Sequence, residues 1–301
     1  MTANLSITVV GAGSWGTALA IQFARTGRRT ILWGREEDHL DRLQEDRENQ
    51  QFLPGARFPE TLEIQPNLPT ALGDADIVLV AVPSHVFRRV LESLRPHLGA
   101  QVRLAWATKG FELSTGKLPH QVAEEVLGDA IPKAVLSGPT FAREVGAGLP
   151  SAMTVAATDE SYARELAESI SGESFRAYTS TDIVGVEVGG AVKNVLAIGA
   201  GICDGLGFGA NTRVALITRG LVEMTRLGVA LGAQPATFMG LAGMGDLVLT
   251  CTDNQSRNRR MGLALAEGKT VAQAETEIRQ VVEGVKAAEA VHQVAGQAGV
   301  E

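Results

Sequence analysis

One lysine stands out in an apolar helical pattern in the second half of the chain. Lys193 lies in the run GGAVKNVLAIGAG, among small and branched apolar residues. Burial disfavours a charged ammonium group and lowers its pKa toward the range useful for proton exchange. We therefore expect Lys193 to exchange a proton with a substrate oxygen and Asn194 to orient that oxygen. The alternative is a lysine that reaches from an apolar helix to water.

A second group of candidates lies in the segment GLAGMGDLVLTCTDNQSRNRRMG. Three arginines, Arg257, Arg259 and Arg260, fall within four residues at an expected helix N-terminus. Arginine suits bidentate phosphate binding, so this run predicts an anion site. Asp246 is a natural partner for Lys193 if the two meet in space. The alternative is a solvated basic helix start with Asp246 in a turn.

Two further polar segments follow expected strands. Lys109 lies in TKGFE, and Gly138, Pro139 and Thr140 lie in SGPTF. Ligands of open α/β sheets bind outside the carboxyl ends of the strands. A lysine there can bind a phosphate or polarise a carbonyl, and the Gly-Pro-Thr turn can offer N–H groups and a hydroxyl to an anion. Either segment taken alone is equally well explained as an ordinary loop.

A glycine-rich turn lies ten residues from the start, in SITVVGAGSWGTALAIQFA. Gly11 allows a tight turn, Gly13 lets the backbone approach a pyrophosphate, and Gly16 lets helix and strand pack closely. The following helix N-terminus adds free N–H groups and a partial positive charge. This strand–turn–helix pattern predicts a dinucleotide site, and the alternative is a tight turn that binds no dinucleotide.

The end of the second expected strand bears on which dinucleotide binds. NAD-specific sites place an acidic residue there, and this chain has Arg35 in TILWGREED. A guanidinium suits a 2′-phosphate, so we expect NADPH. Glu36 and Glu37 follow and leave NADH possible. Arg35 is alternatively the first residue of a solvated helix.

Apolar runs alternate with helical patterns through the first half of the chain. This alternation predicts a doubly wound parallel α/β sheet of the Rossmann type in residues 1–181. The expected strands are 7–10, 30–33, 77–82, 102–107 and 134–136, and the expected helices are 15–25, 36–47 and 86–94.

The second half, residues 182–301, shows no convincing strand and is expected to be an all-α domain. Asp182 can cap a helix that runs through Lys193. Further helices are expected at 214–227 and 255–266. Thr270 and Gln273 form a capping box that opens another helix.

Composition limits the class of protein. The net charge is −7, from 27 basic and 34 acidic residues, which argues against a nucleic-acid platform. The two cysteines and five histidines show no metal-binding spacing, so no metal site and a reduced, cytoplasmic setting are expected. The apolar stretch 192–209 is interrupted by Lys193 and Asp204 and is shorter than the roughly 20 residues of a membrane helix. We expect a buried helix rather than an integral membrane segment.

These motifs together resemble those of bacterial NAD(P)H-dependent glycerol-3-phosphate dehydrogenases. They occur in the family's order over nearly the whole chain. The matching motifs are GAGSWGTALA (11–20), WGR (33–35), VPSH (82–85), TKGFE (108–112), SGPTFARE (137–144), GAVKNVLAIGAG (190–201), GDLVLTCTDNQSRNRR (245–260) and VVEGV (281–285).

The resemblance implies reversible reduction of dihydroxyacetone phosphate to sn-glycerol 3-phosphate, which supplies glycerophospholipid synthesis. It implies that Lys193 is the proton donor, or the acceptor in reverse, in a helical substrate domain that follows a Rossmann-type domain. The implied substrate contacts are Lys109, Gly138, Thr140, Lys193, Asp246, Ser256, Arg257 and Asn258. The implied cofactor contacts, beyond the three glycines, are Ser14, Trp15, Arg35, Lys109, Ala142, Arg257, Val281 and Glu283.

Two other functions remain open at this point. A related dehydrogenase of a 3-hydroxy acid would need a carboxylate pocket and would not need the Arg257 region. A non-catalytic dinucleotide sensor would keep the glycine turn and would not need Lys193. Relatives continue past VHQVAGQAGVE, so the chain looks short at its C-terminus.

We expect a homodimer that binds a small phosphorylated substrate and no nucleic acid.

Overall fold

The computed structural model describes residues 5–278 and 281–300, and the chain divides into two compact units. Unit 1 comprises Met1–Thr108, His120–Leu136 and Thr140–Thr181, and unit 2 comprises Lys109–Pro119, Ser137–Pro139 and Asp182–Glu301. The longest segment of unit 2 begins where the sequence placed the domain boundary. The short segments with Lys109 and Gly138 belong to unit 2, although their place in the sequence predicts the first domain for both.

Unit 1 is built on an eight-stranded sheet with the strand order β5-β2-β1-β6-β7-β8-β9-β10. Strand β1 pairs in parallel with β2 and with β6, so that Thr8 lies opposite both Ile31 and Val78. The strands are β1 (Ser6–Val10), β2 (Arg29–Trp33), β5 (Leu62–Ile64), β6 (Ile77–Val80), β7 (Arg103–Trp106), β8 (Lys133–Ser137), β9 (Ser151–Ala157) and β10 (Phe175–Ser180). The predicted Rossmann-type fold is confirmed.

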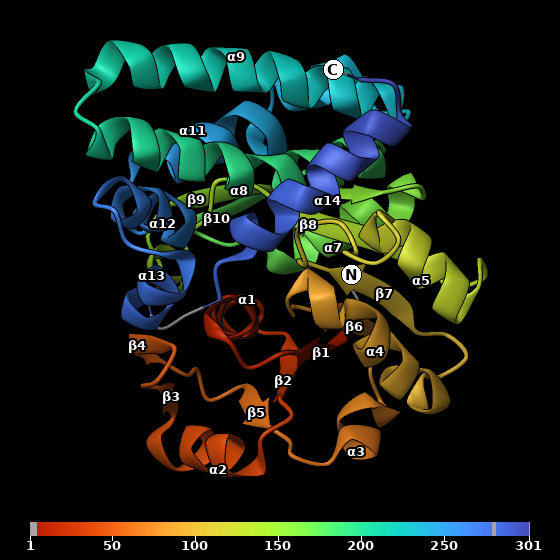
Figure 1. Ribbon diagram of the computed structural model, residues 1–301. Helices are drawn as coiled ribbons and strands as arrows, with labels where there is room; N and C mark the ends of the chain where they lie inside the picture. Colours follow the sequence, from red (N-terminus) through yellow and green to blue (C-terminus); the bar gives the residue numbers. More distant parts are fainter. Residues whose placement is uncertain (1–4, 279–280, 301) are drawn as a thin grey trace. The chain divides into compact units, whose positions relative to one another are not determined.

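Helices connect these strands. They are α1 (Ser14–Arg25), α2 (Glu37–Asp46), α3 (Leu68–Gly73), α4 (Ser84–Leu94), the 3-10 turn η1 (Arg95–His97), α5 (Pro119–Leu127), α6 (Ala142–Ala147) and α7 (Glu160–Ile170). Figure 1 shows α1 nearly end-on beside β1 and β2. Strands β5, β9 and β10 were not predicted from the sequence, because these segments are short or carry polar and exposed residues at alternate positions.

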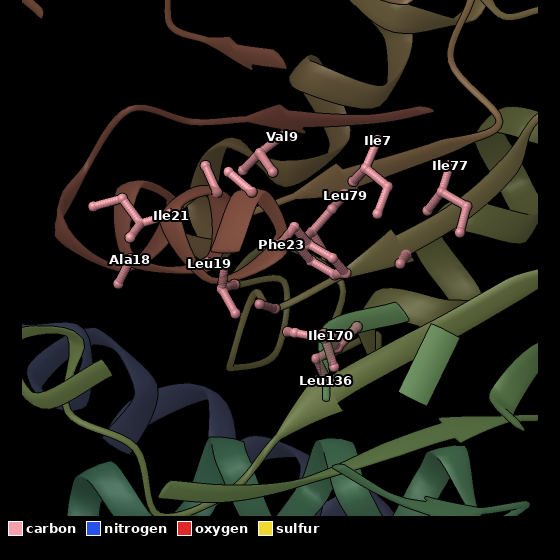
Figure 2. Close-up of a cluster of buried hydrophobic side chains, with 14 of the residues drawn as sticks. Ile7, Val9, Ala18, Leu19, Ile21, Phe23, Ile77, Leu79, Leu136 and Ile170 are labelled. Carbon is pink, nitrogen blue, oxygen red and sulfur yellow. The ribbon is translucent and has the colours of Figure 1, made fainter. Parts of the chain in front are cut away.

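The core of unit 1 follows from the two-residue period of its strands. Ile7 and Val9 on β1, with Ile77 and Leu79 on β6, share one face of the sheet and pack with side chains of α1, including Phe23 (Figure 2). The residues between them in the strands are fully buried as well. Burial on both faces is typical of a parallel sheet covered by crossover helices.

A small two-stranded antiparallel ribbon supports the turn that follows β1. It is formed by β3 (Glu48–Asn49) and β4 (Leu53–Arg57). The fully buried Asn49 donates hydrogen bonds to the Ala12 carbonyl (3.0 Å) and to Thr17 Oγ1 (2.8 Å), and its Oδ1 accepts from the Phe52 N–H (3.1 Å). His39 Nε2 lies 3.3 Å from the same Ala12 carbonyl. Buried polar groups of Asn49 and His39 therefore hold the backbone of the glycine turn in place.

The longest segment of unit 2, which begins at Asp182, contains helices and no strand among its described residues, as predicted. Its helices are α8 (Ile183–Gly205), α9 (Gly209–Ala230), α10 (Pro235–Phe238), the π-helical turn η2 (Leu241–Gly245), α11 (Asp246–Thr252), α12 (Arg257–Ala266), α13 (Val271–Ile278) and α14 (Glu283–Gln297). Figure 1 shows α9 lying alongside α8.

Two predicted helix starts are confirmed by their hydrogen bonds. The Asp182 side chain accepts from the Gly185 N–H at 2.9 Å and begins α8. The Thr270 N–H donates to Gln273 Oε1 at 2.8 Å, and Thr270 Oγ1 accepts from the Gln273 N–H at 3.3 Å. This reciprocal pair is a capping box.

Helix α8 is the only helix of the described chain that is long and apolar enough to cross a membrane. Its most apolar window is 72% buried within the protein, and it packs against α9, α11, α12 and α14. These contacts identify α8 as the central helix of unit 2, which agrees with the buried helix expected from the sequence.

The bonds of Asn49 predict a measurable loss of stability in unit 1. We expect Asn49→Ala to lower the free energy of unfolding by roughly 3 kcal/mol, because it leaves buried polar groups unsatisfied and creates a cavity. All three tryptophans of the chain, Trp15, Trp33 and Trp106, lie in unit 1, so urea unfolding followed by tryptophan fluorescence reports on this unit.

The matched control is Asn67→Ala, which removes an exposed asparagine that caps α3 through the Thr70 N–H. Its expected cost is about 1 kcal/mol. Equal losses for the two variants would show that Asn49 contributes no more than an ordinary surface cap.

Candidate functional site

The turn between β1 and α1 has the geometry that its three glycines predict. Gly11 has φ +122°, and a Cβ there would lie 2.5 Å from the Ala81 carbonyl oxygen. A Cβ on Gly16 would lie 1.9 Å from the Gly11 carbonyl oxygen, whereas a Cβ on Gly13 would meet nothing within 4 Å. Gly11 and Gly16 thus serve close backbone packing, and Gly13 leaves open space beside the turn.

This turn lies at the point where the strand order of the sheet reverses, because β1 pairs with β2 on one side and β6 on the other. Such switch points are where doubly wound sheets bind ligands. The N-cap Gly13 offers no side chain to the first N–H groups of α1, which remain available to an anion. The buried Trp15 Nε1 has no acceptor among the described residues. These features fit the pyrophosphate of a dinucleotide.

Arg35 lies two residues past the end of β2 and is 86% exposed. Its closest charged neighbour is Glu36, at 3.8 Å between Arg35 Nη2 and Glu36 Oε1. A pair of this length between exposed groups is weak. The guanidinium is thus accessible to an anionic ligand, in competition with one adjacent carboxylate.

In unit 2, two lysines share one buried carboxylate. Lys193 Nζ lies 2.5 Å from Asp246 Oδ1, and Lys109 Nζ lies 2.7 Å from Asp246 Oδ2. Lys193 also donates to Thr250 Oγ1 at 3.0 Å. The side chains of Lys193 and Asp246 are 9% and 2% exposed, so Lys193 does not reach to water. The pairing of Lys193 with Asp246 that the sequence suggested is confirmed.

Closely packed backbones place the three charged groups together. Asp246 begins α11 directly after the π-helical turn η2, and such turns are frequent at functional sites. A Cβ on Gly189 of α8 would lie 2.5 Å from the Ala242 carbonyl oxygen of η2, so only glycine permits this approach. Gly189 is one turn before Lys193 on the same face of α8. A Cβ on the next residue, Gly190, would lie 3.3 Å from Lys109 Cγ.

Burial and pairing have opposite effects on the pKa values of this cluster. Burial lowers the pKa of Lys193 and Asp246 raises it, with the result at about 8. Burial raises the pKa of Asp246, but Lys109 and Lys193 outweigh burial and hold it below its usual value. At neutral pH the cluster therefore holds one carboxylate between two ammonium groups, and Lys193 is close to losing its proton.

A second set of predicted site residues lies at the start of α12. Ser256 is the N-cap, and its Oγ accepts from the Arg259 N–H at 3.2 Å. Asn258 Nδ2 donates to Asn194 Oδ1 at 2.9 Å, and Asn258 Oδ1 accepts from the Gly284 N–H at 2.9 Å. Arg257 is the first residue of α12, and no carboxylate of residues 5–278 or 281–300 forms an ion pair with it.

One expectation from the sequence is corrected here. Arg259 does not join Arg257 in a common anion site, because its guanidinium is buried against Asp204 and Asn254. Asn194 Oδ1 accepts a hydrogen bond from Asn258 Nδ2. A role of Asn194 toward a substrate oxygen stays a prediction.

The remaining predicted residues are divided between the units. Gly138 belongs to unit 2, whereas Thr140 and Ala142 belong to unit 1, with Ala142 as the first residue of α6. Val281 is 46% exposed, and Glu283 begins α14. Burial raises the pKa of Glu283, and Arg257, Lys109 and Lys193 oppose this effect.

Two residues of the arrangement were missed in the sequence. Thr250 bonds to Lys193, and Asn49 supports the glycine turn. Thr250 is four residues after Asp246, so a helical interpretation of GDLVLTCT would have placed both on one face. Asn49 carries no local signal. The part of the chain that the structure describes contains no group of three or more histidine, cysteine, aspartate or glutamate residues suited to a metal ion.

Comparison with known proteins agrees with this geometry. Residues 6–163 match the model of the NAD-dependent glycerol-3-phosphate dehydrogenase N-terminus, and residues 182–301 match that of the C-terminus. A glycerol-3-phosphate dehydrogenase [NAD(P)+] of Cronobacter sakazakii is 57% identical over 301 residues, which are 100% of this chain and 89% of the relative. A protein of the same name from Vibrio cholerae is 57% identical over 298 residues, covering 99% of this chain and 87% of its own length.

Solved structures give the same result. The glycerol-3-phosphate dehydrogenase of Coxiella burnetii superposes with a TM-score of 0.95 at 46% identity, covering 99% of this chain and 91% of its own. That of Saccharomyces cerevisiae superposes with a TM-score of 0.85 at 28% identity, covering 98% and 91%. The chain belongs to the NAD-dependent glycerol-3-phosphate dehydrogenase family.

Proposed function

We propose that this protein catalyses the reversible, NAD(P)H-dependent reduction of dihydroxyacetone phosphate to sn-glycerol 3-phosphate, the precursor of glycerophospholipids. The observation that carries the proposal is the pair of ammonium groups of Lys193 and Lys109 on the single buried carboxylate of Asp246. The names of relatives at 57–58% identity support the same activity.

Lys193 is the proton donor in the direction of reduction. When bound, the reduced nicotinamide supplies a hydride to the carbonyl carbon of the substrate. Negative charge then develops on the carbonyl oxygen, and Lys193 Nζ gives its proton to that oxygen. Asp246 Oδ1 and Thr250 Oγ1 hold Nζ in place for this transfer. In the reverse direction the neutral amine takes the proton from the substrate hydroxyl.

Lys109 contributes charge. Two ammonium groups and one carboxylate leave an excess of one positive charge in a buried setting. Fixed positive charge stabilises an oxyanion more strongly where water is excluded. In this proposal Lys109 stabilises the developing alkoxide and keeps Asp246 ionised.

The phosphate of the substrate is held from the start of α12. Arg257 supplies a guanidinium that forms no ion pair with a described carboxylate, and the free N–H groups of the helix N-terminus add to it. Ser256, Asn258, Gly138 and Thr140 complete the proposed substrate contacts. Binding of the remote phosphate supplies energy that aligns the carbonyl for reaction.

The glycine turn of unit 1 is the main part of the proposed cofactor site. The contacts that we assign to it are Gly11, Gly13, Ser14, Trp15, Gly16, Arg35, Lys109, Ala142, Arg257, Val281 and Glu283. We assign NADPH as the preferred form because Arg35 is accessible and only weakly paired.

We also propose a homodimer in the cytoplasm. Val222 and Val229 are exposed, seven residues apart on one face of α9, and Cys203 and Cys251 are free thiols. A light-scattering mass equal to one chain would contradict the dimer, and recovery of the protein from a membrane or periplasmic fraction would contradict the compartment.

A direct assay tests the activity and the role of Lys193 together. The wild-type protein should oxidise NADPH, measured by absorbance at neutral pH, when dihydroxyacetone phosphate is added. We expect Lys193→Met to lower kcat by about 10²–10⁴-fold through loss of the proton donor, with NADPH affinity retained. The control Lys269→Met removes a partly exposed lysine paired with Glu267 and Glu277 and should keep full activity. Cofactor binding without turnover in the wild type would favour a dinucleotide sensor.

The pKa of Lys193 predicts opposite pH profiles for the two directions. Reduction needs the protonated amine, so its rate should fall as pH rises through about 8, while oxidation of glycerol 3-phosphate should rise over the same interval. Asp246→Asn removes the charge that raises this pKa, so both transitions should move to lower pH. Unshifted transitions in Asp246→Asn would assign the titration to another group.

The choice of cofactor form tests Arg35. We expect Arg35→Ala to raise the KM for NADPH about tenfold, because the variant loses one charge-assisted hydrogen bond to the 2′-phosphate. The KM for NADH should change by less than about twofold. Arg89→Ala, another exposed arginine of unit 1, is the control and should change neither KM. An equal effect of Arg35→Ala on both cofactors, or a wild-type preference for NADH, would refute this role.

A further inference from the structure

A partly buried carboxylate of unit 2 has no part in the mechanism above. Asp204 is the penultimate residue of α8, and its side chain is 9% exposed. An acidic residue at a helix C-terminus is disfavoured by the helix dipole. Arg213 of α9 contacts both of its oxygens at 2.8 Å, and Arg259 of α12 contacts Oδ2 at 2.5 Å. Together these two arginines lower the pKa of Asp204 below its usual value, against the effect of burial.

Arg259 connects this carboxylate to the beginning of α12. One arm of its guanidinium binds Asp204, and the other donates to Asn254 Oδ1 in the loop before the helix. Its backbone N–H donates to the N-cap Ser256. Arg259 therefore holds the loop and the first turn of α12 together, and that turn carries Arg257 and Asn258.

Glycine contacts hold α8 and α12 close to each other. A Cβ on Gly201 would lie 2.1 Å from the Arg259 carbonyl oxygen, and a Cβ on Gly262 would lie 2.0 Å from the Ile198 carbonyl oxygen. Smooth contacts of this kind set the separation of two helices but do not lock rotation or sliding. The directional bonds from Arg259 to Asp204 and from Asn258 to Asn194 supply that restraint.

We propose that Asp204 is a positioning residue for the phosphate end of the substrate. Through Arg259 it fixes the first turn of α12, so that Arg257 and Asn258 meet the phosphate at a set distance from Lys193 on α8. It also occupies Arg259, which leaves Arg257 as the arginine that meets the ligand. This inference rests on the substrate contacts assigned under the proposed function.

The test compares two substrates in one variant. Asp204→Asn should lower kcat/KM for dihydroxyacetone phosphate by about ten- to a hundredfold, mostly through KM, because a small displacement of a binding group is costly. Activity with dihydroxyacetone, which lacks the phosphate, should stay at the wild-type level, as should the KM for NADPH. A purely structural role would affect both ketones alike.

The matched control removes the other partner of the same carboxylate. Arg213→Met breaks an ion pair with Asp204 but leaves Arg259 in place, so its KM for dihydroxyacetone phosphate should change by less than about threefold. Arg259→Lys keeps a charge beside Asp204 while losing the bond to Asn254, and should reproduce the selective loss even if Asp204→Asn does not fold. Asp204→Glu, which keeps the charge, should recover part of the affinity.

Equal increases of KM in Asp204→Asn and Arg213→Met, or equal losses with both ketones, would overturn the proposal. Arg257→Ala separates this failure from that of the proposed function. If Arg257→Ala raises KM for the phosphorylated substrate while Asp204→Asn does not, the phosphate contact stands and the positioning role is wrong. If Arg257→Ala has no effect, the assignment of the phosphate contact is wrong.

Discussion

The chemistry of unit 2 depends on one buried carboxylate that two ammonium groups share. Charged groups removed from water are costly unless each finds a partner, and breaking such a pair leaves an uncompensated charge. Asp246, 1% exposed, bonds to Lys193 through one oxygen and to Lys109 through the other. In the proposed mechanism, the excess positive charge of this group stabilises the substrate oxyanion. The surrounding helices can be understood as the means of holding these three side chains in place.

Close approach of the helix backbones holds these side chains in place. It requires glycine residues, which lower the intrinsic stability of a helix. A glycine inside a helix is less stable than alanine by roughly 0.5–1 kcal/mol. Helix α8 nevertheless contains several, and Gly189 and Gly201 meet carbonyl oxygens of η2 and α12 at distances that no side chain permits. Helices of this kind are stabilised mainly by their tertiary contacts. The central helix of unit 2 thus exchanges intrinsic helix stability for the close approach that places Lys193 beside Asp246.

Features set by neighbouring residues could be predicted from the sequence, and features set by distant ones could not. The glycine turn, the Asp182 cap and the Thr270 capping box each depend on residues within a few positions, and each was found. Lys109 lies 137 residues from Asp246, and no local pattern assigns it to unit 2. Three neighbouring arginines look alike in sequence, yet only the tertiary structure turns Arg259 toward Asp204. The strands β9 and β10 were missed because strand pairing, and not a strong apolar pattern, defines them.

The pKa of Lys193 connects this arrangement to a reversible reaction. An exposed lysine has a pKa near 10.4 and is a poor proton acceptor at neutral pH. A buried lysine without a partner can fall to about 5–6, where it has no proton to give. Asp246 offsets part of the effect of burial, and the resulting pKa of about 8 leaves both protonation states accessible close to neutral pH. In the proposed mechanism, the carboxylate that makes burial of two lysines possible therefore also lets Lys193 donate a proton in one direction and accept it in the other.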